Sequence, residues 1–360
     1  MKLPRITILA TLLLTAPAAA QLQITPPVAT PSAVPEKQKP KPPPAAKKKE
    51  AAPAPKPSAS PKPAASPKPA LPATVIPAPA TDNPNVDLVF GAYQRGQYKT
   101  AFDLATARAE AGDPKAMTML GELYSNAMGI RRDYAKALEW YKRASDAGDR
   151  EAMFALAMLR ISGRGGSVDK SEAVKLMASA AKLGEPKAAY NLALLYLDGQ
   201  TLPQDVKRSA ELLRQAADAG LPEAQYALAT FYKEGTGVPK DPERAVRLLQ
   251  AASLADNVDA EVEYAIAMFN GTGTVKNQPA AVALLRKASR QGSAIAQNRL
   301  AWVLINGMGT SVDKVEGFKW HLVAKTSGKG DPELDKQLSE LPAEDRGKAE
   351  AAARKWLGTK

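Results

Sequence analysis

The sequence predicts an all-α fold built as a solenoid of antiparallel helix pairs. The first observation behind this prediction is a step of 36 residues at which alanine recurs. The second is that each step contains two amphipathic segments separated by a loop. The third is the constancy of small residues within the step, which stacked units need for close packing. The leading alanines of the six steps are Ala116, Ala152, Ala188, Ala224, Ala260 and Ala296.

Counted from the leading alanine as position 0, the first eleven residues of each repeat are predicted to form a helix, here called helix A. Positions 0, 4, 7 and 8 fall within one sector of the helical wheel and are mainly apolar. Position 5 is always Gly or Ala, which lets a neighbouring helix approach closely. A Gly-x-Gly loop follows in four repeats, because glycine supplies the positive φ of a tight turn. The loop glycines are Gly163 and Gly165, Gly235 and Gly237, Gly271 and Gly273, and Gly307 and Gly309.

The second helix of each repeat, helix B, is predicted to begin after a polar cap at position 17 and to end near position 32. Asp and Asn are favoured helix N-caps, and glycine is favoured just beyond a helix C-terminus. Asp256 replaces the glycine of position 32 in the fourth repeat, so we expect a looser turn there. The residues at position 17 are Asp133, Asp169, Asp205, Asp241, Asn277 and Asp313. The glycines at position 32 are Gly148, Gly184, Gly220, Gly292 and Gly328.

The repeated pattern resembles the Sel-one-like repeat, a relative of the tetratricopeptide repeat. The shared features are A-x-x-x-L-G/A-x-x-Y, a G-x-G loop, D-x-x-x-A and K-A-A-x-x-G, in six copies over residues 116–331. The resemblance implies a right-handed α-solenoid. Residues 88–113 look like a seventh unit with a shortened loop, which places the solenoid at 83–331. Residues 332–360 are predicted to add one or two capping helices, because an internal repeat exposes apolar surface at its open end.

A candidate binding surface lies on the flank of helix A that the apolar positions leave free, at positions 2, 3, 6, 9 and 10. Registering the motif on the tetratricopeptide pattern implies that this flank lines the concave groove of the solenoid. Aromatic anchors beside an amide and scattered charges suit an extended peptide or a partner helix. The alternative is that many of these side chains pack against the next repeat. The predicted partner-binding residues are Phe154, Met158, Tyr190, Asn191, Leu194, Tyr226, Lys233, Phe269 and Trp302.

Residues 1–20 are typical of a secretory signal peptide, with Lys2 and Arg5 preceding a short apolar run and cleavage expected between Ala20 and Gln21. An uncleaved anchor is the alternative, but the run is well short of the ~20 apolar residues that span a bilayer. The chain contains no Cys. A lipoprotein attachment site and disulfides are therefore excluded, and export without Cys suits the bacterial periplasm.

Residues 21–82 are rich in Pro, Ala and Lys and predict a disordered, extended spacer. Nine Lys against three acidic residues give this spacer half of the net charge of +12. The basic character therefore belongs mainly to the spacer, and it does not make the repeats a nucleic-acid platform. The spacer could make weak contact with cell wall or anionic lipid; the alternative is a tether that only keeps the chain soluble.

The sequence offers no constellation for catalysis. Ser167–Lys170 and Ser311–Lys314 match the Ser-x-x-Lys pattern of some hydrolases, but both occupy one repeat position, where the Asp serves as a helix cap. His321 is the single histidine and falls at position 25, a core position in other repeats, so we expect it to be packed or half-buried. One His without Cys cannot build a zinc site. We therefore expect no enzyme, no metal and no cofactor.

These observations favour an exported scaffold or regulator that binds a protein or peptide partner in the bacterial envelope. The resemblance adds that exported members of the family often modulate envelope signalling or assembly, including restraint of sensor kinases that govern exopolysaccharide. A peptidoglycan-binding module is the alternative, with Tyr and Trp stacking on glycan. A hydrolase of β-lactamase type, an activity of cysteine-rich family members, is a weaker alternative because the paired Cys are absent.

Overall fold

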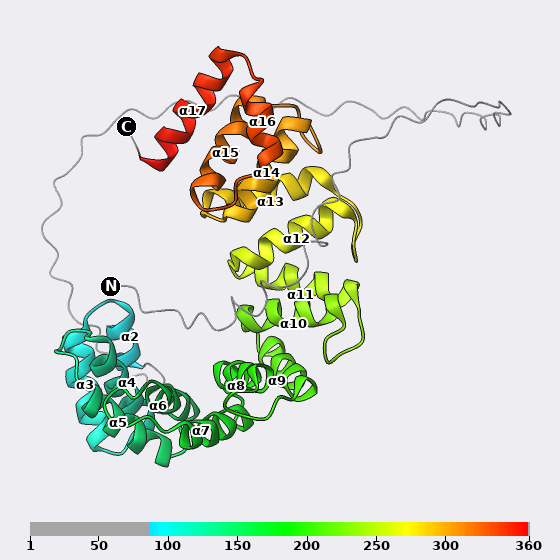
Figure 1. The fold of residues 1–360 in the computed structure, drawn as a ribbon. Coiled ribbons are helices and arrows are strands. Elements are labelled where there is room, and N and C mark those ends of the chain that lie inside the picture. The colour runs from blue at the N-terminus through cyan, green and yellow to red at the C-terminus, as the bar shows by residue number, and fades with distance from the viewer. Residues whose placement is uncertain (1–86, 359–360) are drawn as a thin grey trace, which may run out of the picture. The chain divides into compact units, whose positions relative to one another are not determined.

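The computed structural model describes residues 87–358, and this part of the chain contains sixteen helices and no strand. Consecutive helices from α2 to α15 pack against each other in chain order (Figure 1). The predicted all-α solenoid of helix pairs is therefore confirmed. The predicted signal peptide, its cleavage site at Ala20 and Gln21, and the spacer of residues 21–82 lie outside the described residues.

Each of the six repeats consists of two helices of thirteen residues joined by a seven-residue loop. Helix A of successive repeats is α4 (Pro114–Asn126), α6 (Arg150–Ser162), α8 (Pro186–Asp198), α10 (Pro222–Glu234), α12 (Val258–Asn270) and α14 (Ala294–Asn306). Helix B is α5 (Tyr134–Asp146), α7 (Lys170–Lys182), α9 (Val206–Asp218), α11 (Pro242–Leu254), α13 (Gln278–Arg290) and α15 (Lys314–Thr326).

The predicted caps at position 17 are confirmed in all six repeats. Each Asp or Asn side chain accepts a hydrogen bond of 2.9–3.1 Å from the backbone N–H three residues later. This bond satisfies one of the N–H groups that the first turn of a helix leaves free. The Asp of each Ser-x-x-Lys segment, Asp169 and Asp313, is one of these caps, as expected.

The turn at Asp256 keeps the backbone conformation of the other repeats without a glycine. Asp256 adopts φ +58°, the left-handed conformation that the glycines of the other repeats adopt. The hydrogen bond from Asn257 N to Ala252 O is 3.0 Å, against 3.1 Å for the matching bond from Leu221 N to Ala216 O. The N–H of Ala255, however, bonds to the carbonyl three residues back (Ala252, 3.1 Å), whereas that of Ala219 bonds four residues back (Gln215, 3.2 Å). A looser turn stays a prediction. The backbone at Asp256 is strained, because left-handed φ is unfavourable for a residue with a Cβ.

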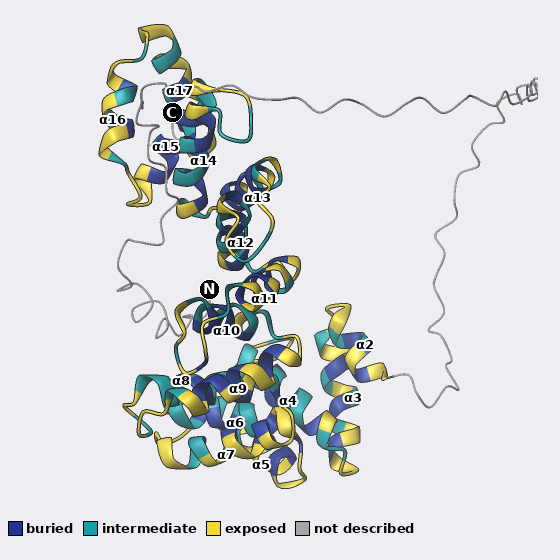
Figure 2. Ribbon diagram, turned by 90° about the vertical axis from the view of Figure 1, so that its right-hand side faces the viewer, coloured by how far each residue is buried: buried dark blue, intermediate teal, exposed yellow. Residues whose placement is uncertain are grey.

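Small side chains allow the close helix packing that the sequence indicated. The alanine at position 28 is fully buried in every repeat. A Cβ added to Gly121, at position 5, would lie 2.6 Å from the ring of Tyr141, so the large ring of the first repeat requires glycine opposite it. Each helix has a buried side toward its neighbours and an exposed side (Figure 2). His321 is fully buried, which confirms the expectation of a packed histidine.

Additional helices follow and precede the six repeats. At the N-terminal end α2 (Leu88–Gln94) packs on α3 (Tyr98–Glu110), which packs on α4. At the C-terminal end lie α16 (Pro332–Ser339) and α17 (Ala343–Leu357), and α17 packs on α15, where the rings of Trp320 and Trp356 meet edge to face at 5.0 Å. None of the helices between residues 87 and 358 combines the length and apolarity needed to span a bilayer.

Candidate partner-binding face

Two contacts link the flank of an A helix to the unit that follows it. Lys233 Nζ on α10 lies 3.0 Å from Glu263 Oε2 on α12. Trp302 Nε1 on α14 donates a hydrogen bond of 2.8 Å to Asp331, the residue that caps α16. These contacts join positions 6 and 9 of one repeat to the first part of the next A-type helix. Positions 2, 3, 6 and 9 of the A helices, the flank to which these residues belong, are here called the A-face.

The middle of the A-face is aromatic and apolar. Phe154 and Met158 on α6, Tyr190 and Leu194 on α8, and Tyr226 on α10 are each partly exposed to solvent. All except Leu194 also pack against the core of the central repeats. Packing on one side fixes the position of a side chain, and exposure on the other leaves it available for contact. Such pre-ordered aromatic side chains are typical anchors of protein interfaces.

The two tyrosines of the A-face remain neutral hydrogen-bonding groups. Burial, with a smaller contribution from the Glu223 carboxylate, raises the pKa of Tyr190. Burial, followed by the charges of Glu263 and nearby carboxylates, raises the pKa of Tyr226 strongly. Neither hydroxyl forms a hydrogen bond within the described part of the chain. Each can therefore donate to a carbonyl or carboxylate of a bound segment.

The polar residues of the A-face are arranged around this middle. Asn191 Nδ2 donates to the Lys187 carbonyl at 2.8 Å, which orients the side chain on α8. The guanidinium of Arg299 on α14 is half-buried, and burial lowers its pKa despite the opposing charges of Asp331 and Glu263. Its Nε atom is buried without a hydrogen-bond partner in the described residues. Arg299 and Glu263 were not among the predicted binding residues, although both occupy position 3, one of the flank positions.

The nine predicted residues fall into two groups. Seven lie on three consecutive A helices, α6, α8 and α10, and form one patch. The other two lie apart from this patch. Phe269 on α12 is only 5 % exposed, so it contributes to the core and offers little surface to a partner. Trp302 is two repeats beyond α10 and has its indole N–H bonded to Asp331.

The acidic side chains and the single histidine of the described residues were compared with the requirements of a metal site. No group of three or more His, Cys, Asp or Glu side chains lies close enough to hold a metal ion between residues 87 and 358. His321 is fully enclosed, and its Nε2 atom lies 2.8 Å from Asp335 Oδ1. The A-face can therefore recognise a partner through shape, apolar contact and hydrogen bonds.

Comparison with known proteins identifies the family. The Sel1 repeat family model matches six consecutive segments: residues 114–149, 150–185, 186–221, 222–257, 258–293 and 294–328. These segments make up more than half of the chain, and the protein belongs to the Sel1 repeat family. Sel1 repeats commonly serve as scaffolds for protein–protein interaction and are generally non-catalytic.

Two solved structures share this fold. One is c5321, a protective antigen of uropathogenic Escherichia coli that displays an SLR fold; it is 24% identical over 76% of this chain and 64% of its own, with a TM-score of 0.63. The other is a Sel1 repeat protein from Oxalobacter formigenes, 24% identical over 66% of this chain and 94% of its own, with a TM-score of 0.56. The chain thus spans just under two thirds of the length of c5321. No functionally curated protein is similar enough to count as a match.

Proposed function

We propose that this protein is an exported, non-catalytic scaffold that binds a protein or peptide partner through the A-face. The observation that supports this most directly is the patch formed by Phe154, Met158, Tyr190, Leu194 and Tyr226. All five side chains are partly exposed, all except Leu194 pack against the core, and the two tyrosine hydroxyls form no hydrogen bond within the described residues. A partly exposed apolar and aromatic patch of this kind is a common interaction site.

We place this activity in the bacterial envelope, most plainly the periplasm, where the partner would be a component of envelope signalling or assembly. The signal-peptide pattern of residues 1–20 and the absence of Cys support this location. The basic spacer would then give the repeats reach from a surface that it contacts weakly.

The experiment that tests the A-face compares two tyrosines of one helix. A photo-crosslinking residue at Leu194 captures the partner in cells, and mass spectrometry names it. Purified partner is then titrated against Tyr190→Ala and against Tyr196→Ala. Both tyrosines lie on α8, both are half-buried and both pack on the core, but Tyr196 lies at position 8, outside the A-face. This pairing controls for the loss of packing in the helix.

We expect Tyr190→Ala to weaken binding about ten- to one-hundred-fold, the loss typical of an interface hot spot, and the double variant with Tyr226→Ala to abolish capture. Tyr196→Ala should leave the affinity within about two-fold, since residues outside an interface contribute little. Equal losses from Tyr190→Ala and Tyr196→Ala would contradict the A-face as the binding site. If the protein sediments with purified peptidoglycan, and adding the purified partner does not change the amount that sediments, the result would instead favour the cell-wall alternative.

A further inference from the structure

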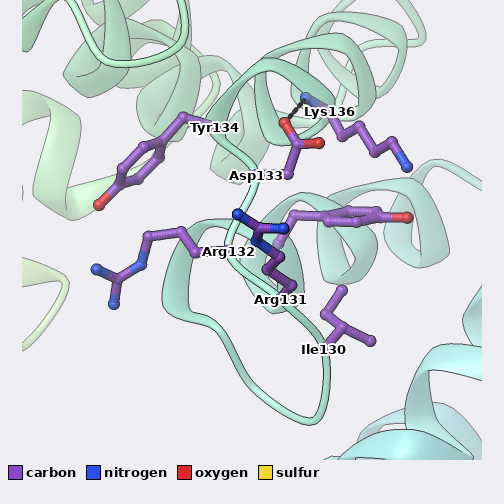
Figure 3. Close-up of a pocket in the computed structure, with 7 residues that line it drawn as sticks. Ile130, Arg131, Arg132, Asp133, Tyr134 and Lys136 are labelled. Atoms are coloured by element: carbon purple, nitrogen blue, oxygen red, sulfur yellow. Dashed lines mark hydrogen bonds between the residues drawn. The ribbon is translucent and has the colours of Figure 1, made fainter.

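A second candidate site lies where the first repeat turns from α4 into α5. Tyr124 at the end of α4, Arg131, Arg132 and Asp133 in the loop, and Lys136 in the first turn of α5 line an open hollow of about 540 Å³. In Figure 3, Arg131 projects toward Asp133 in the middle of the hollow, Arg132 lies on the side of Tyr134, and Lys136 extends away on the other side. We call this hollow the loop pocket. It shares no residue with the A-face.

The cations of the loop pocket are not neutralised by the protein. No carboxylate of the described residues lies within 4.0 Å of the charged groups of Arg131, Arg132 or Lys136, nor of Arg164 in the next loop. Tyrosine rings contact three of these four cations instead. Lys136 Nζ lies 5.4 Å from the centre of the Tyr124 ring. The guanidiniums of Arg132 and Arg164 lie 5.8 and 5.6 Å from the centre of the Tyr134 ring. A ring face attracts a cation but does not cancel its charge.

The single acid that lines the loop pocket already has another partner. Asp133 accepts a hydrogen bond of 3.0 Å from the backbone N–H of Lys136 and so caps α5. Three cations and one capping carboxylate therefore line the pocket, which has a formal surplus of two positive charges. Like charges gathered in this way favour an anion from solution.

The loop itself does not need its two arginines. In all six repeats the loop has seven residues and closes with a backbone hydrogen bond of 2.8–3.2 Å from the N–H of position 17 to the carbonyl of position 8. The same closure is made with Ser-Val in repeats 2 and 6, with Pro in repeats 3 and 4, and with Val-Lys in repeat 5, at positions 15 and 16. Since side chains this different support the same turn, the consecutive Arg131 and Arg132 are not explained by folding.

We propose that the loop pocket is a binding site for a phosphate group. A phosphate monoester has a charge close to −2 at neutral pH, which matches the surplus of the pocket better than a single carboxylate does. Guanidinium groups present paired N–H donors to phosphate oxygens, and the Lys136 ammonium adds a mobile point charge. The phosphate could belong to a small soluble molecule or to a lipid headgroup, and both would be recognised by the same three side chains.

The test uses the full chain and two probes. Inorganic phosphate is titrated by calorimetry at constant ionic strength, and vesicles of phosphatidylcholine with and without phosphatidic acid are used in co-sedimentation. The site variant is Arg131→Ser with Arg132→Val, which installs the residues that repeats 2 and 6 already fold with. The matched control is Lys240→Gln with Lys276→Gln, which removes two charges at position 16 of other repeats. The unmodified chain and both variants all contain the basic spacer. Any binding of anions by the spacer is therefore the same in all three and cancels in the comparison.

We expect the site variant to weaken binding at least about ten-fold, because it removes both guanidiniums, and the control to stay within about two-fold of the unmodified chain. Lys136→Gln should weaken binding by a smaller factor. Loss of inorganic phosphate binding in the site variant supports the proposal with a soluble ligand. Loss of phosphatidic acid binding alone supports it with a lipid headgroup. If the site variant binds both probes as the control does, or if neither probe binds the unmodified chain, the proposal is overturned.

Discussion

At the scale of single residues, position 1 of helix A shows how the fifth repeat departs from the fourth and the sixth. Gln225 and Gln297 use this position to donate to a carbonyl of the preceding B helix, Ala217 at 3.3 Å and Ser289 at 3.1 Å. Glu261 occupies the same position in the fifth repeat and is fully buried. A carboxylate, unlike the glutamine amide, has no N–H group to donate to the carbonyl of the preceding B helix. Glu261 pairs instead with Lys287 Nζ at 2.8 Å.

We predict that Glu261→Gln stabilises the fold by about 1 kcal/mol or more, since it removes a buried charge and supplies the missing amide donor. The remaining lysine is 42 % exposed, so its ammonium can be hydrated without its partner. The free energy of unfolding, from urea titration at pH 7, measures the change. The reciprocal variant Gln297→Glu should cost about 2–4 kcal/mol, because position 27 of that repeat is Val323 and offers no cation. A less stable Glu261→Gln protein would mean that the ion pair outweighs the hydrogen bond.

At the scale of elements, the junction of α15 and α16 is held by a small polar cluster. His321 Nε2, fully buried on α15, lies 2.8 Å from Asp335 Oδ1 on α16, and Lys325 Nζ lies 2.8 Å from both oxygens of that carboxylate. The hydrogen bond from Lys325, and then that from His321, lower the pKa of Asp335. A carboxyl group with a lowered pKa in the folded state stabilises the fold above its unfolded-state pKa of about 3.9. That stabilisation is lost as the pH falls through the lower value in the fold.

We therefore predict that Asp335→Asn lowers the melting temperature at pH 7 and that the difference from the unmodified chain shrinks toward zero as the pH falls through the lowered pKa of Asp335. The effect at pH 7 should be under about 1 kcal/mol, because the Asp335 side chain is 37 % exposed and water screens its charge. Asp146→Asn is the control, since within residues 87–358 Asp146 pairs only with exposed Lys142 on its own helix. Thermal unfolding followed by circular dichroism from pH 2 to pH 8 measures both variants. A difference that is constant over this range would contradict an electrostatic origin.

At the scale of the whole molecule, the 36-residue period was sufficient to predict the structure within one repeat. It was insufficient to predict the side-chain contacts between one repeat and the next. Helix pairs, caps at position 17 and buried alanines at position 28 follow from the chemistry of a single unit. The pair of Lys233 with Glu263 and the bond from Trp302 to Asp331 depend on the rotation and shift between units. No spacing within one repeat encodes that displacement. For the same reason Phe269 is buried although its flank position suggested a binding role.

If each repeat contacts mainly its neighbours, one whole unit can be removed without destroying the fold. Deleting residues 222–257, the fourth repeat, would join α9 to α12 through the same turn that now joins α9 to α10. In the deletion variant Val258 follows Leu221 directly. Helix α12 then presents Ala260 and Ala265 at the positions that Ala224 and Ala229 of α10 occupy in the unmodified chain. Because one set of repeat interfaces is lost, we expect a lower free energy of unfolding with the helical signal per residue unchanged.

Deleting residues 222–239 is the control, since it removes helix A of that repeat with most of its loop and leaves α9 packed against a second B helix. This half-unit deletion should abolish cooperative unfolding, because α11 lacks the pattern of small residues that an A helix presents to the preceding repeat. Circular dichroism and urea titration compare the two proteins. Cooperative folding of both would mean that the unit of this solenoid is the single helix, and loss of folding in both would mean that stability depends on contacts beyond adjacent repeats. If only the whole-unit deletion folds, the 36-residue helix pair is the folding unit. That variant also lacks the part of the A-face that includes Tyr226.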